Sequence, residues 1–423
     1  MRNHVKSSAL VASIGSTALL LASIGGTAGL CGAASAAEQS AGPQVTAGLA
    51  KSLKAAQDAI RERKLDEALA RIHEAQTSSG EKSSYDGFVI NLMLFQIYQQ
   101  KQDMATAIPV LAQLAQSSYA KSDQQKSWLK NIALYYFQQQ QYAKALEAAD
   151  QAVKLGANDN DTVRLIAKSQ YLTGKYKDAA LTMQELVKRQ DKPEEESLKL
   201  LWQFSLKAND QADATTAVEK LVAYYPKPEY WANALASLAN SDTKDAHLQL
   251  NVYRLMDDVG ILKRGGDYAE MADIALDQGY PGETEAVLRK AFAQNVFTEP
   301  RDKERYQHLL DGAKQRAAAD QAALPAREAD AAAAASGDKL VQLGADYMSY
   351  GQYDKAATSI SRGIAKGGLK SPDEANVLLG IAQLRLKNPG EAQKAFGKAA
   401  ASRNSGYTQL GRFWALHAGA HNV

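Results

Sequence analysis

Residues 127–193 contain two copies of one sequence repeat, and this repeat restricts the fold more than any other feature. The first copy reads WLKNIALYYFQQQQYAKALEAADQAV and has small residues at Ala133 and Ala145. The second reads VRLIAKSQYLTGKYKDAALTMQELV and has them at Ala167 and Ala179, so both separations are 34 residues (167 − 133 and 179 − 145). A period of about 34 residues with helix–turn–helix patterning is typical of a helical solenoid. We therefore expect stacked pairs of helices rather than one central core.

Composition agrees with an all-α chain. The sequence is 45% hydrophobic but only 7% aromatic. Helix-forming Ala, Gln, Lys and Leu dominate, and no long run alternates β-branched with polar residues in the way that a strand does. A chain of 423 residues would ordinarily hold two or three domains. A solenoid can reach this length by adding repeats, because each repeat packs only on its neighbours.

The N-terminus has the pattern of a secretory signal peptide. Arg2 and Lys6 give a positive start, residues 9–31 are mostly apolar, and small residues follow at 32–37 with Ala34-Ser35-Ala36 or Ser35-Ala36-Ala37 as the cleavage motif. This order predicts a cleaved signal peptide over residues 1–37 and export to the periplasm. The alternative is an uncleaved inner-membrane anchor, since residues 9–31 are long enough to cross about 30 Å of hydrocarbon.

Processing at this point changes the chemistry of the mature chain. Cys31 is the only cysteine, and it follows Leu30 rather than the small residue that usually precedes a lipidated cysteine. Its removal excludes disulfides, cysteine nucleophiles and thiolate metal sites. Loss of Arg2 and Lys6 reduces the 49 basic residues to 47 (49 − 2), which equals the 47 acidic ones. A neutral mature chain gives no reason to expect nucleic acid as a partner.

The repeat continues on both sides of the duplicated segment. After a polar linker at residues 38–47, we expect an N-terminal solenoid over residues 48–296. Residues 297–336 are rich in Ala and predict a helical spacer that Pro325 should end or kink. Residues 337–423 predict a C-terminal pair of repeats with a capping helix. In this pair Gly344 and Gly380, and likewise Ala356 and Ala392, are 36 residues apart.

These motifs resemble the tetratricopeptide repeat (TPR). The resemblance is carried by the Leu-Gly pairs before the small-residue positions, the GQYDKA turn and the Ala that follows it. It implies a right-handed α-α superhelical solenoid of TPR-like helix–turn–helix repeats. The later stretch GQYDKAATSISRGIAKGGLKSPDEANVLLGIAQ is similar to secreted or periplasmic repeat proteins of Gram-negative bacteria. That similarity implies an envelope location and no particular reaction.

The resemblance also implies a binding surface. In repeats of this kind the inner helix exposes its second, fifth, ninth, twelfth and thirteenth positions toward a concave face. Counting from the small residues gives a groove lined by basic, aromatic and apolar side chains. We predict that the partner-binding residues are Lys130, Phe137, Arg164, Lys168, Tyr171, Lys199, Gln203 and Lys207. We expect an extended acidic peptide or a carboxylate-bearing tail. The alternative is that these charges belong to an ordinary solvated helix face.

The equivalent positions in the C-terminal pair are apolar: Val341, Ala345, Met348, Val377, Ile381 and Leu384. They form either a second groove for an amphipathic helix or a face covered by the chain itself. The terminal helix around Trp414 and the Ala-rich spacer are the candidates for that cover. We expect burial by the chain itself.

No catalytic pattern is present. The six histidines form no zinc-hydrolase motif, and His417 and His421 have suitable spacing but are expected in a fraying tail. There is no G-x-S-x-G motif, phosphate-binding loop or dinucleotide fingerprint. We therefore expect no enzyme activity, no metal and no cofactor. A helical-solenoid hydrolase would need a separate catalytic lobe, for which the repeats leave no room.

The sequence therefore predicts a non-catalytic adaptor or assembly scaffold in the bacterial periplasm, with a protein or peptide partner. The alternative is a constitutive accessory subunit of a trans-envelope complex for energy transduction, secretion or polysaccharide export. Stable purification with one membrane complex would favour the second function. Weak, salt-sensitive capture of peptides would favour the first.

Overall fold

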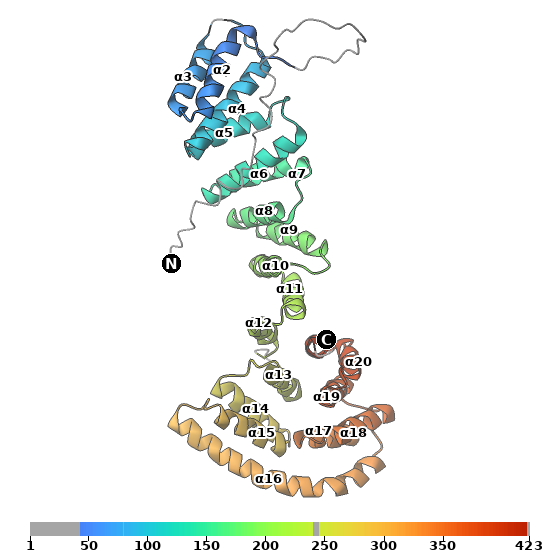
Figure 1. The fold of residues 1–423 in the computed structure, drawn as a ribbon. Coiled ribbons are helices and arrows are strands. Elements are labelled where there is room, and N and C mark those ends of the chain that lie inside the picture. Colours follow the sequence, from blue (N-terminus) through green and yellow to red (C-terminus); the bar gives the residue numbers. More distant parts are fainter. Residues whose placement is uncertain (1–42, 79, 240–244, 421–423) are drawn as a thin grey trace. The chain divides into compact units, whose positions relative to one another are not determined.

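The computed structural model describes residues 43–78, 80–239 and 245–420, and this part of the chain forms 20 helices and no strand (Figure 1). The predicted all-α fold is confirmed. The predicted signal peptide, Cys31 and His421 lie outside the described residues. Among the described helices, none has the length and apolar character needed to cross a bilayer.

The chain divides into two compact units. The first extends to residue 191 and includes residues 207–209; the second comprises residues 192–206 and the chain from 210 onward. The helices of the first unit are α2 (Ala47–Arg61), α3 (Leu65–Thr77), α4 (Ser84–Gln100), α5 (Met104–Ala115), α6 (Ser122–Gln138), α7 (Tyr142–Lys154), α8 (Asn160–Leu172) and α9 (Tyr176–Lys188). Those that lie wholly or mostly in the second are α10 (Glu195–Lys207), α11 (Gln211–Tyr224), α12 (Pro228–Ala239), α13 (Ala246–Asp258), α14 (Gly265–Asp277), α15 (Pro281–Ala293), α16 (Pro300–Ala333), α17 (Asp338–Ser349), α18 (Tyr353–Lys366), α19 (Pro372–Arg385), α20 (Pro389–Ala400) and α21 (Ser405–Ala420).

The first unit is a stack of TPR-like helical hairpins. Helix α2 packs on α3, α4 on α5, α6 on α7 and α8 on α9, while each hairpin also contacts the next. The apolar core runs through the stack in two clusters. One cluster is centred on Leu53, Ile72 and Met93, and the next on Leu111 and Trp128. This is the solenoid arrangement that the repeat predicts, because each apolar face is buried by a neighbouring repeat.

The small residues of the repeat are packing positions, as the sequence predicts. Ala68, Ala107, Ala145, Ala179, Ala356 and Ala392 are fully buried. In the C-terminal hairpins the helices approach still more closely. A Cβ on Gly344 would lie 2.3 Å from Cγ1 of Ile360, and a Cβ on Gly380 would lie 2.3 Å from Cε1 of Phe396. Real Cβ atoms do not tolerate such distances, so a side chain at either position would force Ile360 or Phe396 to move.

The turns between paired helices share one backbone conformation. A residue with positive φ follows the first helix of the hairpin at Arg63 (60°), Gln140 (58°), Gly174 (81°) and Lys387 (61°). Only glycine adopts this left-handed conformation without steric cost. Three of these four positions nevertheless carry a side chain. The turn is therefore imposed by the packing of the two helices rather than by the residue in it.

Helix α16 differs from the sequence prediction in one respect. It continues through Pro325 to Ala333, so of the two expected outcomes, an end or a kink at Pro325, the end is wrong. Leu324 is buried, and α16 packs on both α15 and α17, so tertiary contacts outweigh the local cost of proline. Figure 1 draws α16 as one curved helix that runs along α14 and α15 and then along α17 and α18. It occupies most of the predicted spacer 297–336, and the predicted boundary at 296/297 falls inside the second unit.

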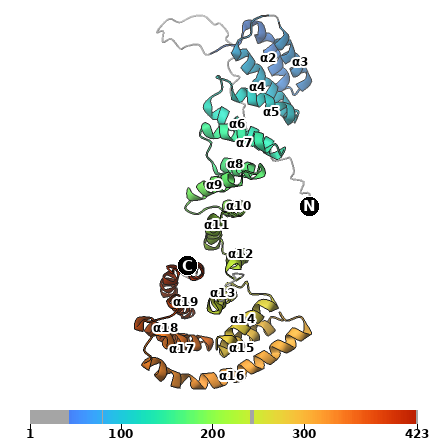
Figure 2. The same ribbon diagram turned by 180° about the vertical axis from the view of Figure 1, so that it is seen from behind.

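The C-terminal helices of the second unit return to its beginning. Helix α21 contacts α11 and α13 as well as α19 and α20, and α13 also contacts α19 (Figure 2). Of the apolar positions of the C-terminal pair, Ala345, Met348, Val377 and Ile381 are buried, whereas Val341 and Leu384 are half-buried. The expected burial of this face by the chain itself is confirmed at the first four positions.

Candidate functional site

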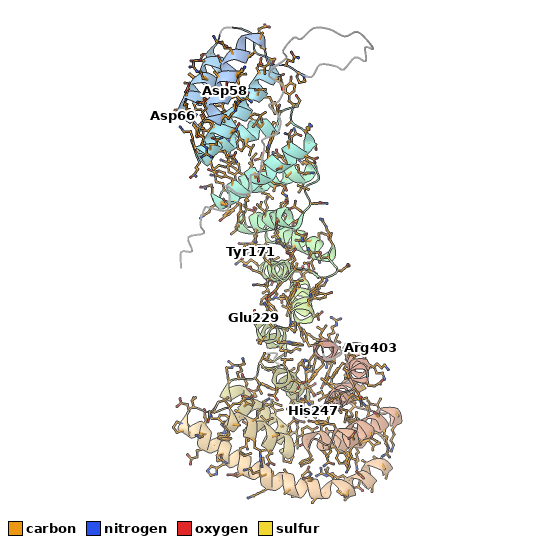
Figure 3. The ribbon with its side chains drawn as sticks, viewed as in Figure 1. Asp58, Asp66, Tyr171, Glu229, His247 and Arg403 are labelled. Atoms are coloured by element: carbon orange, nitrogen blue, oxygen red, sulfur yellow. The ribbon has the colours of Figure 1, made fainter. Side chains whose placement is uncertain are left out.

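The residues predicted to form a basic groove belong to both units. Lys130, Phe137, Arg164, Lys168, Tyr171 and Lys207 lie in the first unit, whereas Lys199 and Gln203 lie in the second. The two groups are described in turn. Within the first unit, the adjacent helices α6 and α8 carry equivalent residues side by side. Tyr171 on α8 is labelled in Figure 3.

Lys130 on α6 and Arg164 on α8 have carboxylate partners. Lys130 Nζ lies 2.8 Å from Oδ2 of Asp159, whose other oxygen accepts a hydrogen bond from the backbone N–H of Thr162 (3.1 Å) at the start of α8. Burial alone would raise the pKa of Asp159, but these bonds outweigh it and the pKa is lowered. Arg164 pairs with Asp161 at 2.6 Å, and its side chain is only 14% exposed. This face therefore carries less uncompensated positive charge than the count of basic residues indicates.

The aromatic residues of this face form a repeated pattern. Phe137 packs on Tyr142 with ring centroids 5.4 Å apart, and Tyr171 packs on Tyr176 at 5.3 Å. Lys207 Nζ lies 5.6 Å from the centroid of the Tyr176 ring. Half-buried rings beside a cation can contact both apolar and acidic groups of a ligand.

Lys199 and Gln203 line a shallow cleft of about 570 Å³ in the second unit, together with Glu195, Glu196, Leu200 and Lys227. Glu195 accepts hydrogen bonds from Lys227 Nζ, at 2.5 Å, and from the Tyr230 hydroxyl. The bond from Lys227 is the main reason why the pKa of Glu195 is lowered. With two glutamates and two lysines, this cleft has no excess of positive charge.

A larger cavity of about 720 Å³ lies in the second unit, and no sequence motif predicts it. Its walls come from α13 to α19 and from α21, and they include Arg254, Arg289, Lys290, Lys314, Arg385 and Trp414. These residues come together because α19 and α21 return to α13. No local sequence pattern predicts that α19 and α21 return to α13.

Polar contacts of α13 with α19 and α21 stabilise this arrangement. Asp258 accepts hydrogen bonds from Arg385 of α19 at 2.6 Å and from His417 of α21 at 2.9 Å. Burial would raise the pKa of Asp258, but the His417 and Arg385 contacts outweigh burial and lower it. At the other end of α13, Nδ1 of His247 (labelled in Figure 3) lies 2.8 Å from Oε1 of Glu374. The prediction that His417 lies in a fraying tail is wrong, because it is part of α21 and its ring contacts both Asp258 of α13 and Trp414.

Buried within the same unit is a second ion pair. Arg254 makes two contacts with the Glu283 carboxylate, Nε to Oε1 at 2.8 Å and a terminal guanidinium nitrogen to Oε2 at 2.6 Å. Burial disfavours the charged guanidinium, yet the carboxylate outweighs that effect and raises the pKa of Arg254. Among the described residues, no group of three or more His, Cys, Asp and Glu side chains could hold a metal ion.

Comparison with known proteins gives a structural likeness only. No protein-family model and no curated protein matches the chain. It is similar to a tetratricopeptide repeat protein from Parabacteroides merdae, at 12% identity over 78% of this chain and 98% of that one, with a TM-score of 0.29. It is also similar to the structure of Naa15/Naa10 bound to HypK-THB, at 14% identity over 84% of this chain and 58% of that one, with a TM-score of 0.39. The description as a TPR-like solenoid rests on the hairpins and buried small residues reported above.

Proposed function

We propose that the protein is a non-catalytic protein–protein interaction scaffold that binds an extended acidic peptide segment along α6 and α8 of its first unit. The observation that carries this proposal is a repeated pair of side chains. Lys130 and Phe137 on α6 recur as Arg164 and Tyr171 on α8, and the two helices are in contact. A segment that crosses both helices meets a cation and an aromatic ring on each of them.

The ion pairs of this face determine how such a segment would bind. A ligand carboxylate would replace Asp159 beside Lys130, or Asp161 beside Arg164. For the exposed Lys130 pair, an exchange of this kind changes the free energy by less than about 1 kcal/mol. Contact with the aromatic rings adds to the affinity. We expect weak binding that becomes weaker as the salt concentration rises, because ions screen the exchanged charges.

A charge-reversal experiment tests the proposal. The double substitution Arg164→Glu and Lys168→Glu should abolish capture of the partner in a crosslinking pulldown and leave the helical CD spectrum unchanged. A matched control places the same substitutions at Lys177 and Lys188, exposed lysines on α9, the second helix of the same hairpin. The control should retain the partner. Capture that is unaltered in the first variant contradicts the proposal.

We further propose that the scaffold works in the periplasm. Support comes from the charged start, apolar run and cleavage motif within residues 1–37. N-terminal sequencing of protein isolated from the periplasmic fraction should begin just after the Ala-rich motif. Recovery of the intact N-terminus in the membrane fraction would instead identify residues 9–31 as an anchor.

A further inference from the structure

The cavity of the second unit has an excess of positive lining residues. Five basic residues (Arg254, Arg289, Lys290, Lys314 and Arg385) and three acidic ones (Asp257, Glu283 and Glu285) line it. At about 720 Å³ it falls within the range of about 300–1,000 Å³ that is typical of ligand pockets. The lining residues come from α13 to α19 and from α21, so the site exists only when these helices are folded together.

In several ion pairs around the cavity the two partners differ in their exposure to solvent. Arg289 is 63% exposed while its partner Glu285 is 21% exposed, and Lys290 is 44% exposed while Asp257 is 25% exposed. The same holds for Arg385, at 40% against 11% for Asp258. In each of these three pairs the carboxylate is the more buried partner, whereas Glu283 is more exposed than Arg254 (16% against 7%) and Asp311 more than Lys314 (56% against 40%). At Arg289, Lys290 and Arg385 the accessible charge that a ligand meets is therefore positive.

The rest of the lining is apolar and aromatic. Met271, Met348, Ile381, Tyr350 and Tyr353 contribute to the walls. Trp414 also lines the cavity and is fully buried, and its indole N–H has no hydrogen-bond acceptor in the part of the chain that the structure describes. Buried indole N–H groups normally find an acceptor.

We propose that this cavity is a second binding site, which takes a short acidic peptide segment that also carries apolar side chains. Acidic groups of the segment pair with Arg289, Lys314 and Arg385, and its apolar groups contact Met348 and Ile381. The site is independent of the face proposed on α6 and α8, because every lining residue belongs to the second unit. The protein would then hold two acidic segments at once, one on each unit.

The test uses a fluorescein-labelled peptide of about six residues that alternates Glu and Leu, titrated with the full-length protein and followed by fluorescence anisotropy. The variant Arg289→Glu with Lys314→Glu should weaken binding at least tenfold. The matched control is Arg301→Glu with Lys303→Glu, which reverses two exposed charges on α16 that do not line the cavity. The control should bind as the natural protein does. If the glutamate variant fails to fold, Arg289→Gln with Lys314→Gln should still weaken binding.

Three results would overturn the proposal. The first is equal affinity in the cavity variant and its control. The second is equal binding of a peptide with Gln in place of Glu. The third is loss of this binding in Arg164→Glu with Lys168→Glu but not in the cavity variant, which would assign the peptide to the first unit. A photoreactive form of the peptide gives an independent readout, and its crosslinks should map to α15–α18.

Discussion

The buried pair of Arg254 and Glu283 makes a sharp prediction about stability. The Arg254 side chain is 7% exposed and that of Glu283 is 16% exposed. Removing one member of a buried ion pair leaves the other charge uncompensated and costs about 3–5 kcal/mol. Glu283→Gln keeps the shape and one acceptor oxygen, and Arg254 retains its bond to Asn251 (2.9 Å). We therefore expect the lower end of this range, about 3 kcal/mol.

The same helix provides the control. Glu285 lies two residues further along α15 and pairs with Arg289, whose side chain is 63% exposed. Exposed pairs contribute about 0–1 kcal/mol, so Glu285→Gln should have little effect. Since the two glutamates are similarly exposed, at 16% and 21%, the contrast measures what burial of the arginine partner adds.

Urea unfolding followed by tryptophan emission measures both variants. Trp202, Trp231 and Trp414 report on the second unit, while Trp128 reports on the first. Glu283→Gln should lower the urea midpoint of the second unit with an unchanged slope. A midpoint shift no larger than that of Glu285→Gln would refute the reasoning. Replacing the whole pair, as Arg254→Met with Glu283→Leu, should be nearly neutral, because no buried charge is then left unpaired.

Three further predictions concern other parts of the second unit. Gly380→Val should cost about 1–3 kcal/mol of unfolding free energy, because the new Cβ would overlap Phe396, and unchanged thermal unfolding would contradict it. The bond to Glu374 raises the pKa of His247, so its stabilisation is complete below the ordinary value of about 6.5 and disappears as pH rises through the raised pKa. His247→Gln should therefore lower the Tm at pH 6 and not at pH 10; an equal loss at both would contradict this. Pro325→Ala should stabilise the second unit by up to about 3 kcal/mol and raise the Tm, and a lowered Tm would contradict this.

The parts of the fold that follow from local periodicity could be predicted from the sequence. The small residues Ala133, Ala145, Ala167 and Ala179 recur every 34 residues, and all four are buried. Periodicity predicts them because a solenoid repeats the same contact between neighbouring elements. Pro325 shows the limit of local reasoning, since its cost is fixed by the residue but is outweighed by the contacts of α16.

The candidate sites were harder to predict, because their properties depend on pairing across the chain. The positions of Lys130 and Arg164 on the inner helices follow from the repeat, but their neutralisation by Asp159 and Asp161 depends on how α8 begins. The cavity could not be predicted at all. Asp258, Arg385 and His417 are ordinary charged residues in the sequence, and only the return of α21 to α13 makes them partners.

That return has a consequence for how the protein unfolds. In an open solenoid, contacts reach only the adjacent repeat, and the loss of a terminal helix affects only the end of the stack. Here the bond between His417 and Asp258 joins residues 159 positions apart, and that between His247 and Glu374 joins residues 127 apart. The second unit should therefore unfold as one cooperative block from α11 to α21, while the hairpins of the first unit can open one after another. Deletion of α21 would then weaken hydrogen-exchange protection in α13 as strongly as in α20, although α13 ends more than a hundred residues earlier in the chain.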